Sequence, residues 1–252
     1  MSTVVSVLTT KDGQGSSTLA LSLAWTAAEE SRVMLVDADM SGTGNLADLI
    51  ALDFGARGVG NLFGTLAISA YALEQQAVTV RQQPRLRLVP GLQGFCGPGV
   101  AELLPRLKPA LESLPEELVI LDLGAALAHP RQESSRRAGE AICELSHRVL
   151  VVVQDSPARL VKSIQVLRTA QLPQAELVLL ETRRGVLREQ ITRTLAEHLP
   201  GLPISAVLPW DVRQAQRAED AAKPVTQPGL LRALNLLPAA SASGNPLGER
   251  AG

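Results

Sequence analysis

Short runs of continuous apolar residues alternate along this chain with longer segments of helical character. Continuous apolar runs are typical of strands that are buried on both faces of a parallel sheet. Strands that alternate with helices imply right-handed crossovers and helices on both faces. The sequence therefore predicts an α/β fold with three layers, doubly wound around a mostly parallel sheet. The predicted strands are Thr3–Leu8, Val33–Asp37, Leu86–Pro90, Leu118–Asp122, Val149–Val153, Leu177–Leu180 and Ile204–Leu208, and the predicted helices are Ser16–Glu30, Gly99–Ser113, Gln132–Leu145, Pro157–Ala170, Val186–Leu199 and Val212–Ala221.

The length of 252 residues and the hydrophobic fraction of 46% suit one large α/β domain. No linker or internal repeat divides the sequence, so we predict a single domain over residues 1–237. Residues 238–252 are small, polar and rich in proline and glycine, and we expect them to be a disordered tail. A net charge of −1 gives no overall attraction to nucleic acid or to an anionic membrane.

Several classes of protein are disfavoured by what the sequence lacks. Cys96 and Cys143 have no metal-like or redox-like spacing, and the histidines are scattered, so no zinc site is indicated. The first ten residues have no basic segment or cleavage site, and no apolar run reaches the roughly 18 residues that cross a bilayer. We therefore expect a cytoplasmic protein, with recruitment to the inner face of the cytoplasmic membrane left open.

A glycine-containing segment between the first predicted strand and the first predicted helix is the strongest candidate for a binding site. Lys11-Asp12-Gly13-Gln14-Gly15-Ser16-Ser17-Thr18 has the strand, loop and helix order of a P-loop. In such loops backbone N–H groups and the helix N-terminus form a nest for an anion. Gly13 and Gly15 supply the backbone freedom that a nest needs, although a plain glycine turn has the same residues.

This loop resembles the deviant Walker A motif of the ParA/MinD family of P-loop ATPases, KGGxGK[ST][ST]. Lys11, Gly13, Gly15, Ser17 and Thr18 match that motif. In the family the early lysine reaches across a dimer to the phosphates of the partner's nucleotide. The resemblance thus implies a homodimer, ATP or ADP with Mg²⁺ as cofactors, and a catalytic role for Lys11. It also implies phosphate contacts from Gly13, Gln14, Gly15, Ser16, Ser17 and Thr18.

Two positions depart from the motif. Ser16 stands where the family has a lysine that neutralises the β- and γ-phosphates, and Asp12 stands where it has a glycine. Loss of such a charge-assisted hydrogen bond costs on the order of 1–3 kcal/mol, so nucleotide binding is expected to be weak or absent. A serine or alanine at this lysine position is similar to the CpaE/TadZ pilus-assembly branch. The BcsQ-like cellulose-secretion branch also lacks the lysine.

Two acidic strand ends extend the resemblance. Val33–Asp39 is similar to the family's VLLVDxD segment, in which the residue matched by Asp39 helps position the attacking water. Leu118–Gly124 resembles Walker B with the start of switch II, which implies that Asp122, Ser17 and Asp39 surround Mg²⁺. The role of Asp37 stays open, and an aspartate that simply ends a buried strand is the alternative for Asp122.

Later segments resemble the family less completely. Asp155-Ser156-Pro157 followed by Lys162-Ser163 is similar to its V-V-x-P-x-x-x-S segment. The asparagine that reads adenine in the family is absent after Leu180, where Glu181-Thr182-Arg183 follows. Pro209-Trp210-Asp211 resembles the closing loop beside the adenine, which implies nucleotide contacts from Pro209 and Asp211.

The function indicated is a nucleotide-dependent dimerising switch or scaffold with weak or no ATP hydrolysis. Its expected partners are protein components of a cell-envelope machine for pilus assembly or polysaccharide secretion. A pseudo-ATPase that binds partners without nucleotide is one alternative, and a DNA-partitioning ATPase is another, less favoured one. The Leu-rich run 230–237 is short, so we expect it to pack on the core and any membrane contact to be indirect or weak. The arginines that a DNA-binding surface would use are Arg183, Arg184, Arg188, Arg193, Arg213 and Arg217.

Overall fold

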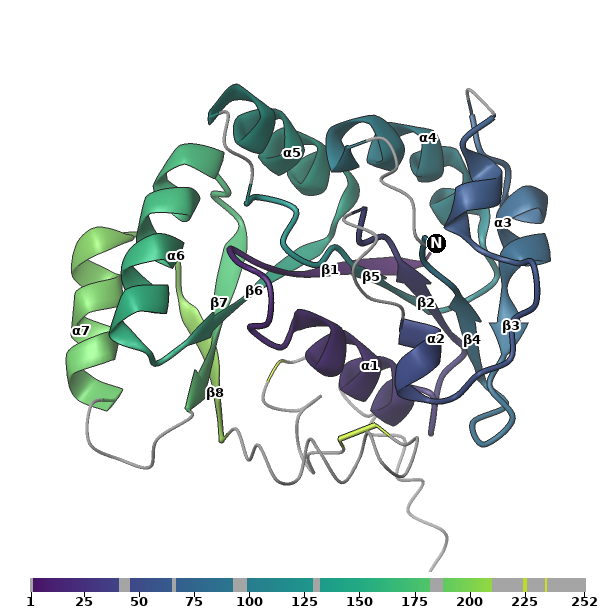
Figure 1. Ribbon diagram of the computed structural model, residues 1–252, viewed down its shortest axis with the longest axis horizontal. Coiled ribbons are helices and arrows are strands. Elements are labelled where there is room, and N and C mark those ends of the chain that lie inside the picture. Colours follow the sequence, from purple (N-terminus) through teal and green to yellow (C-terminus); the bar gives the residue numbers. More distant parts are fainter. Residues whose placement is uncertain are drawn as a thin grey trace, which may run out of the picture.

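The computed structural model describes residues 2–40, 46–64, 67–92, 99–128, 132–181, 188–209, 224–225 and 234. Its centre is an eight-stranded sheet in the order β3-β4-β2-β5-β1-β6-β7-β8 (Figure 1). Only the pairing of β3 with β4 is antiparallel among these strands. The strands are β1 (Thr3–Thr9), β2 (Val33–Asp37), β3 (Val78–Thr79), β4 (Leu86–Val89), β5 (Leu118–Asp122), β6 (Arg148–Gln154), β7 (Ala175–Glu181) and β8 (Ile204–Pro209).

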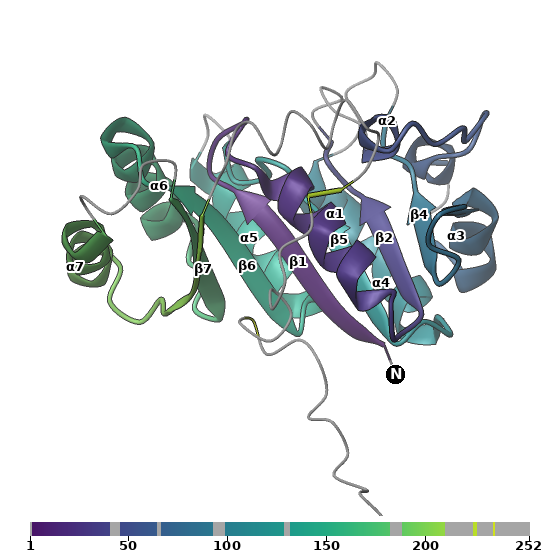
Figure 2. The same cartoon turned by 90° about the horizontal axis from the view of Figure 1, so that it is seen from below.

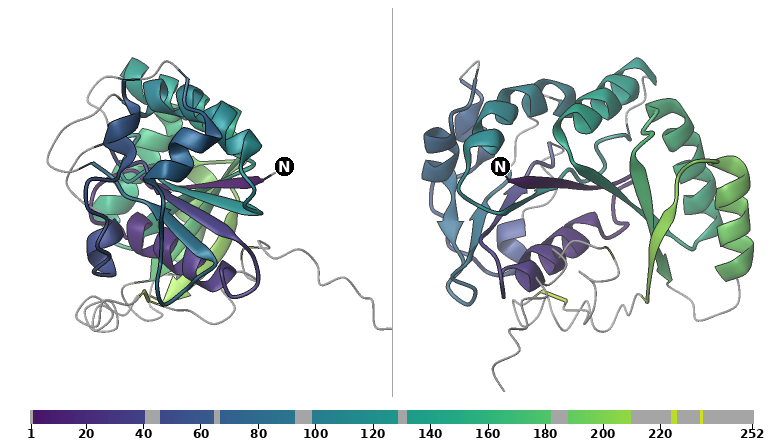
Figure 3. Two further views of the ribbon diagram at one scale, coloured as in Figure 1. Left: turned by 90° about the vertical axis from the view of Figure 1, so that its right-hand side faces the viewer. Right: turned by 180° about the vertical axis from the view of Figure 1, so that it is seen from behind.

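Helices cover both faces of the sheet, as Figures 1 and 2 show. One face carries α1 (Ser16–Ala27) and α2 (Leu46–Leu49). The opposite face carries most of the others, and Figure 3 shows these layers from the side and from behind. That second group comprises α3 (Ala70–Gln76), α4 (Val100–Ser113), α5 (Gln132–Leu145), α6 (Pro157–Ala170) and α7 (Arg188–His198), and a 3₁₀ helix, η1 (Val59–Leu62), adds to the same layer.

The core is divided by the sheet because successive strand residues point to opposite faces. In β1, Val4 and Leu8 pack under the α4 and α5 layer, whereas Val5 and Val7 pack against α1. Every residue of β2 and β5 is buried, as the continuous apolar runs predicted. The predicted fold class, a doubly wound and mostly parallel α/β sheet, is therefore confirmed.

The predicted strands are all present, with ends that differ by a few residues. The prediction missed α2, η1, α3 and the two-residue edge strand β3, which interrupt the stretch between β2 and β4. The predicted helix 212–221 and the expected tail 238–252 lie outside the described residues, so the domain boundary at residue 237 stays a prediction.

Candidate functional site

The carboxyl end of β1 leads into a tight loop that ends at the first turn of α1. Gly13 has φ 71° and Gly15 has φ 91°, both in the left-handed region that favours glycine. Gly15 is the N-cap of α1, and its carbonyl accepts the first helical bond, from the Leu19 amide at 2.9 Å. Thr9 Oγ1 donates to the Lys11 carbonyl at 2.9 Å and closes the start of the loop. The bend that the sequence predicts is thus present and opens onto a helix N-terminus.

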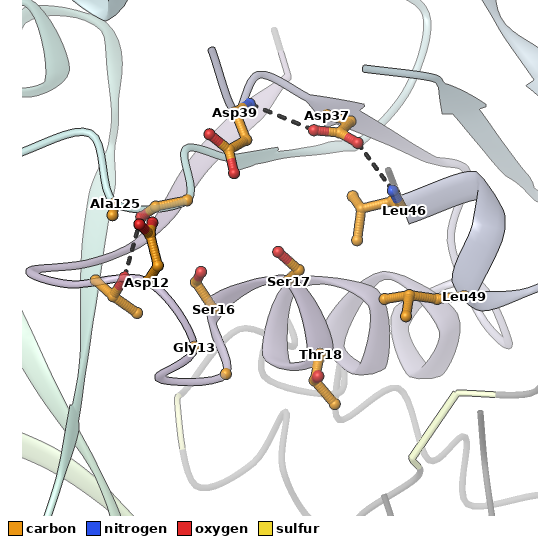
Figure 4. Close-up of a pocket in the computed structure, with 13 residues that line it drawn as sticks. Asp12, Gly13, Ser16, Ser17, Thr18, Asp37, Asp39, Leu46, Leu49 and Ala125 are labelled. Carbon is orange, nitrogen blue, oxygen red and sulfur yellow. Dashed lines mark hydrogen bonds between the residues drawn. The ribbon is translucent and has the colours of Figure 1, made fainter. Parts of the chain in front are cut away.

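A cavity of about 280 Å³ lies at this helix N-terminus (Figure 4). In Figure 4, Ser16 and Ser17 point into it from below and Asp39 points toward them from the end of β2, whereas Thr18 points away. The sheet order explains the convergence, because β1, β5 and β2 are neighbours whose carboxyl ends share one edge. The cavity is lined by Thr9, Asp12, Gly13, Gly15, Ser16, Ser17, Thr18, Asp37, Asp39, Leu46, Leu49, Gly124 and Ala125.

Most of the predicted phosphate-loop residues therefore lie together, but some do not. Lys11 is exposed beside the loop and is not among the lining residues. Gln14 is buried behind the loop, and Pro209 lies at the exposed end of β8 on the far side of the sheet order. Asp211 lies outside the described residues. Asp12 lines the cavity, with its carboxylate on the side where Ala125 lies in Figure 4.

Asp37 and Asp122 are register partners at the ends of adjacent strands, and each is 1% exposed. Burial, followed by the negative charge of Asp122, raises the pKa of Asp37 to about 8. Its carboxylate accepts the Leu46 amide at 2.9 Å and the Asp39 amide at 3.3 Å, which hold α2 and the segment after β2. These bonds favour a structural role for Asp37, the residue whose role the sequence left open.

Asp122 is the more exceptional carboxylate. Its Oδ1 accepts the Gly124 amide at 3.1 Å, but Oδ2 is buried and has no hydrogen-bond partner among the described residues. Burial raises the pKa of Asp122 to about 6, although the nearby Ser17 hydroxyl acts in the opposite direction. A buried carboxylate oxygen without a partner, beside a serine hydroxyl, is an arrangement that a hard divalent cation or its water shell would satisfy.

Gly124 fixes the distance between the two acidic strand ends. It has φ 51°, and the Asp39 carboxyl occupies the space that a Cβ at this position would take. Gly124 also accepts the Thr9 amide through its carbonyl at 2.8 Å. The D-x-G pattern of residues 122–124 therefore has a physical reason in this chain, since no other residue lets Asp39 approach β5 so closely.

The end of β6 and the start of α6 also contact the loop between β1 and α1. Arg159 donates through one guanidinium nitrogen to the Gly13 carbonyl at 3.2 Å and to Gln154 Oε1. Thr10 and Ser163 share a hydroxyl bond of 2.6 Å, and both are fully buried. The sequence indicated Ser163 through its resemblance but gave no signal for Arg159 or Gln154, which approach the loop only through the β1–β6 pairing.

Gln14, in the same loop, has a buried side-chain amide that lacks hydrogen bonds among the described residues. The side chain is 1% exposed, and neither its Oε1 nor its Nε2 has a hydrogen-bond partner among the residues that the structure describes. It does not line the cavity, so its side chain does not face a ligand there. An unpaired buried amide of this sort destabilises the fold by roughly 1–3 kcal/mol for each polar group.

The chain's later segments bear on the alternatives for function. Leu234, within the Leu-rich run, is fully buried in the α1-side core, and its carbonyl accepts a bond from Arg148. That position supports packing on the core. Of the arginines considered for DNA, Arg188 pairs with Glu181 at 3.7 Å, while Arg183, Arg184, Arg213 and Arg217 lie outside the described residues.

Two features are absent from the described part of the chain. No helix there combines the length and the apolar character that crossing a bilayer requires. No group of at least three His, Cys, Asp or Glu side chains there could by itself hold a metal ion. A cation held at Asp122 by the described residues would therefore need further ligands, such as a serine hydroxyl, water or a bound anion.

Comparison of the amino-acid sequence with protein-family models and with curated proteins gave no match. Solved structures do match over nearly the whole chain. A ParA family ATPase from Chlorobium tepidum has a TM-score of 0.68 at 17% identity, covering 94% of this chain and 96% of that one.

Two MinD structures are similar to a comparable extent. MinD from Pyrococcus horikoshii, complexed with Mg-ADP, has a TM-score of 0.63 at 17% identity over 89% of this chain and 88% of its own. The MinC:MinD complex from Aquifex aeolicus has a TM-score of 0.70 at 14% identity, covering 93% of this chain and 95% of that one. This chain therefore has the fold of the ParA/MinD ATPases.

Proposed function

We propose that this protein is a nucleotide-dependent dimerising switch of the ParA/MinD type that binds Mg²⁺-ATP weakly and hydrolyses it slowly or not at all. The observation that carries the proposal is the convergence, in one cavity, of the Gly13–Gly15 bend, the first turn of α1 and the carboxylate of Asp39. Backbone amides and a helix N-terminus suit phosphate oxygens. The MinD structure from Pyrococcus horikoshii supports the proposal because that protein, on the same fold, is complexed with Mg-ADP.

The residues present fit a magnesium ion in one respect. Asp122, whose Oδ2 has no hydrogen-bond partner among the described residues, lies close to Ser17, and the Ser17 hydroxyl is a ligand of the kind that magnesium accepts next to a phosphate. Ser17 and Asp122 would hold Mg²⁺, with Asp39 nearby. A bound Mg²⁺ would neutralise charge on the phosphate oxygens. Lys11, exposed at the rim, is free to extend toward a second subunit rather than into its own cavity.

The cavity also explains why binding should be weak. A hydroxyl at Ser16 replaces a cation, and the Asp12 carboxylate lines the same cavity. Each change makes the nest less favourable for a polyanion. These two observations support the second candidate, a pseudo-ATPase that dimerises or binds partners without nucleotide.

Titration calorimetry with Mg-ATP at millimolar ligand separates the two candidates. The switch proposal expects measurable heat, and the Ser16→Lys variant should bind about 5- to 150-fold more tightly because a charge-assisted contact of roughly 1–3 kcal/mol returns. Ser113→Lys, which adds the same charge at the exposed end of α4, is the control and should leave affinity unchanged. Absence of heat in the wild type and in Ser16→Lys would leave only the pseudo-ATPase.

The machine served by such a switch is proposed from the loop alone. Its resemblance to the CpaE/TadZ and BcsQ-like loops suggests pilus assembly or polysaccharide secretion at the cell envelope. DNA partitioning is less favoured, because Arg188, one of the two arginines considered for DNA that the structure describes, is paired with Glu181. Retention on a DNA column that falls steeply with salt would favour partitioning instead.

A further inference from the structure

A cation that the loop motif does not contain lies against the phosphate loop. Arg159, in the first turn of α6, donates to the Gly13 carbonyl at 3.2 Å and to Gln154 Oε1. Gln154, which is 6% exposed, also donates through Nε2 to the same Gly13 carbonyl, at 3.4 Å. The Gly13 carbonyl thus accepts hydrogen bonds from two side chains, Arg159 and Gln154. These two side chains are also bonded to each other, because Arg159 donates to Gln154 Oε1.

This contact determines how the loop's central peptide is oriented. A peptide unit is planar and trans, so its carbonyl and its N–H point in opposite directions. With the Gly13 carbonyl held on the α6 side, this planar unit cannot rotate freely, and Gly13 keeps its place in the lining of the cavity. The buried Gln14 side chain further restricts rotation of this unit.

Charge makes a second contribution. Arg159 has no carboxylate partner within the part of the chain that the structure describes, in contrast to Arg136 and Arg148. Its positive charge is therefore not cancelled by a neighbouring acid, and it is bonded to a peptide of the anion nest. Ser16, which lines the nest, supplies no charge of its own.

We propose that Arg159 is a positioning residue of the phosphate loop. It holds the Gly13 peptide in the lining of the cavity, and its charge partly replaces the cation absent at Ser16. The ligand class is the phosphate chain of a nucleoside di- or triphosphate. This role rests on the proposed function, since it requires that the cavity binds such a chain.

The test is titration calorimetry of Mg-ADP and Mg-ATP into the full chain and its variants. Arg159→Met should weaken binding roughly tenfold or more, because the charge and both hydrogen bonds are lost. Arg159→Lys keeps the charge without the forked donors and should fall between Arg159→Met and the wild type. The control is Arg168→Met, on the same helix but bonded to His198, which should bind as the wild type does.

A merely structural role is distinguished by rescue. Adding Ser16→Lys to Arg159→Met should restore most of the lost affinity if a missing cation caused the loss, whereas a distorted loop would not recover. Circular dichroism melting identifies variants that do not fold. Should Arg159→Met be one of them, Arg159→Lys decides alone, because severalfold weaker binding supports the proposal and unchanged binding overturns it.

The remaining outcomes separate this inference from the proposed function. Nucleotide binding by the wild type that Arg159→Met leaves unchanged overturns the role of Arg159 only. Loss without rescue by Ser16→Lys overturns the charge replacement. Absence of binding in the wild type and in Ser16→Lys overturns the proposed switch, and the role of Arg159 falls with it.

Discussion

Gln14 is the residue at which the loop departs most from an ordinary protein interior. A buried glutamine normally satisfies both ends of its amide, and here neither end has a partner within the described part of the chain. The cost is borne by the folded state because the amide is hydrated when the chain unfolds. A loop that carries such a residue is held in place by its other contacts, among them those from Thr9 and Arg159.

Gln14→Leu should therefore stabilise the protein. Leucine fills a similar volume without unpaired polar atoms, and we expect the free energy of unfolding to rise by roughly 1–3 kcal/mol. Urea denaturation followed by circular dichroism measures this change. Gln165→Leu, an exposed position on α6, should stay within about 0.5 kcal/mol of the wild type. A less stable Gln14→Leu would contradict the assignment of an unsatisfied amide.

Asp37 makes stability depend on pH in a direction that can be derived. Its pKa is raised to about 8 in the fold, chiefly by burial, from an ordinary value of 3.8. The folded state then holds the proton more tightly than the unfolded state, so this contribution to stability is fully present below about pH 4 and is lost as pH rises through 8. The raised pKa of Asp122 causes a similar loss of stability as the pH rises from about 4 to 6.

Asp37→Asn should flatten this profile above pH 5 when no divalent cation is present. Asparagine cannot ionise, and its amide oxygen can still accept the Leu46 amide bond. Urea midpoints measured between pH 5 and 9 provide the test. Asp48→Asn, an exposed acid on α2, should leave the wild-type slope intact. An equally steep profile in Asp37→Asn would show that another group is responsible.

The residue-scale site was only partly predictable from sequence. Gly13, Gly15, Ser16, Ser17 and Asp39 could be grouped because loop and strand ends are local features. Arg159 and Gln154 could not, since they meet Gly13 across 146 and 141 residues of chain. No local pattern carries a contact of that range, which depends on strand pairing.

At the scale of elements, α5 and α6 are packed more closely than side chains normally permit. Gly139 on α5 faces the carbonyl of Ala170 at the end of α6, and that oxygen occupies the space of a Cβ. Glycine is ordinarily unfavourable inside a helix by about 1 kcal/mol relative to alanine. The close packing of α5 against the end of α6 explains why a glycine is present at position 139.

Gly139→Ala should consequently destabilise the protein despite its better helix propensity. The added methyl group forces the two helices apart, and we expect a loss of roughly 1–3 kcal/mol in the free energy of unfolding. Ser134→Ala, on the same helix and only partly buried, is the matched control and should be nearly neutral. A Gly139→Ala protein that equals or exceeds the wild type in urea midpoint would argue against the close approach.

The elements that are buried along their whole length were predicted from the sequence. Strands such as β2 and β5 are buried throughout, and their continuous apolar sequences made them evident. The short α2 and the two-residue β3 were missed because so few residues establish no period. Their positions depend on tertiary contacts, such as the bond from the Leu46 amide to Asp37.

At the scale of the whole molecule, comparison at 14–17% identity establishes the fold over nearly the entire chain. The loop at the start of α1 carries a serine, Ser16, at the position where the proposed switch would gain from a cation. The burial of Leu234 beneath α1 shows that at least this part of the Leu-rich run contributes to the core. In the proposed switch, nucleotide in this loop joins two copies of the chain through Lys11.

The most direct test is light scattering coupled to size-exclusion chromatography, with and without saturating Mg-ATP. We predict that the wild type doubles its mass only with nucleotide, since Lys11 is exposed and is not among the residues that line its own cavity. Lys11→Ala should remain monomeric under the same conditions, and Lys162→Ala, an exposed lysine on α6, should dimerise normally. A nucleotide-dependent dimer that persists in Lys11→Ala would contradict the role of Lys11. A wild-type protein whose mass does not change with Mg-ATP would contradict nucleotide-dependent dimerisation.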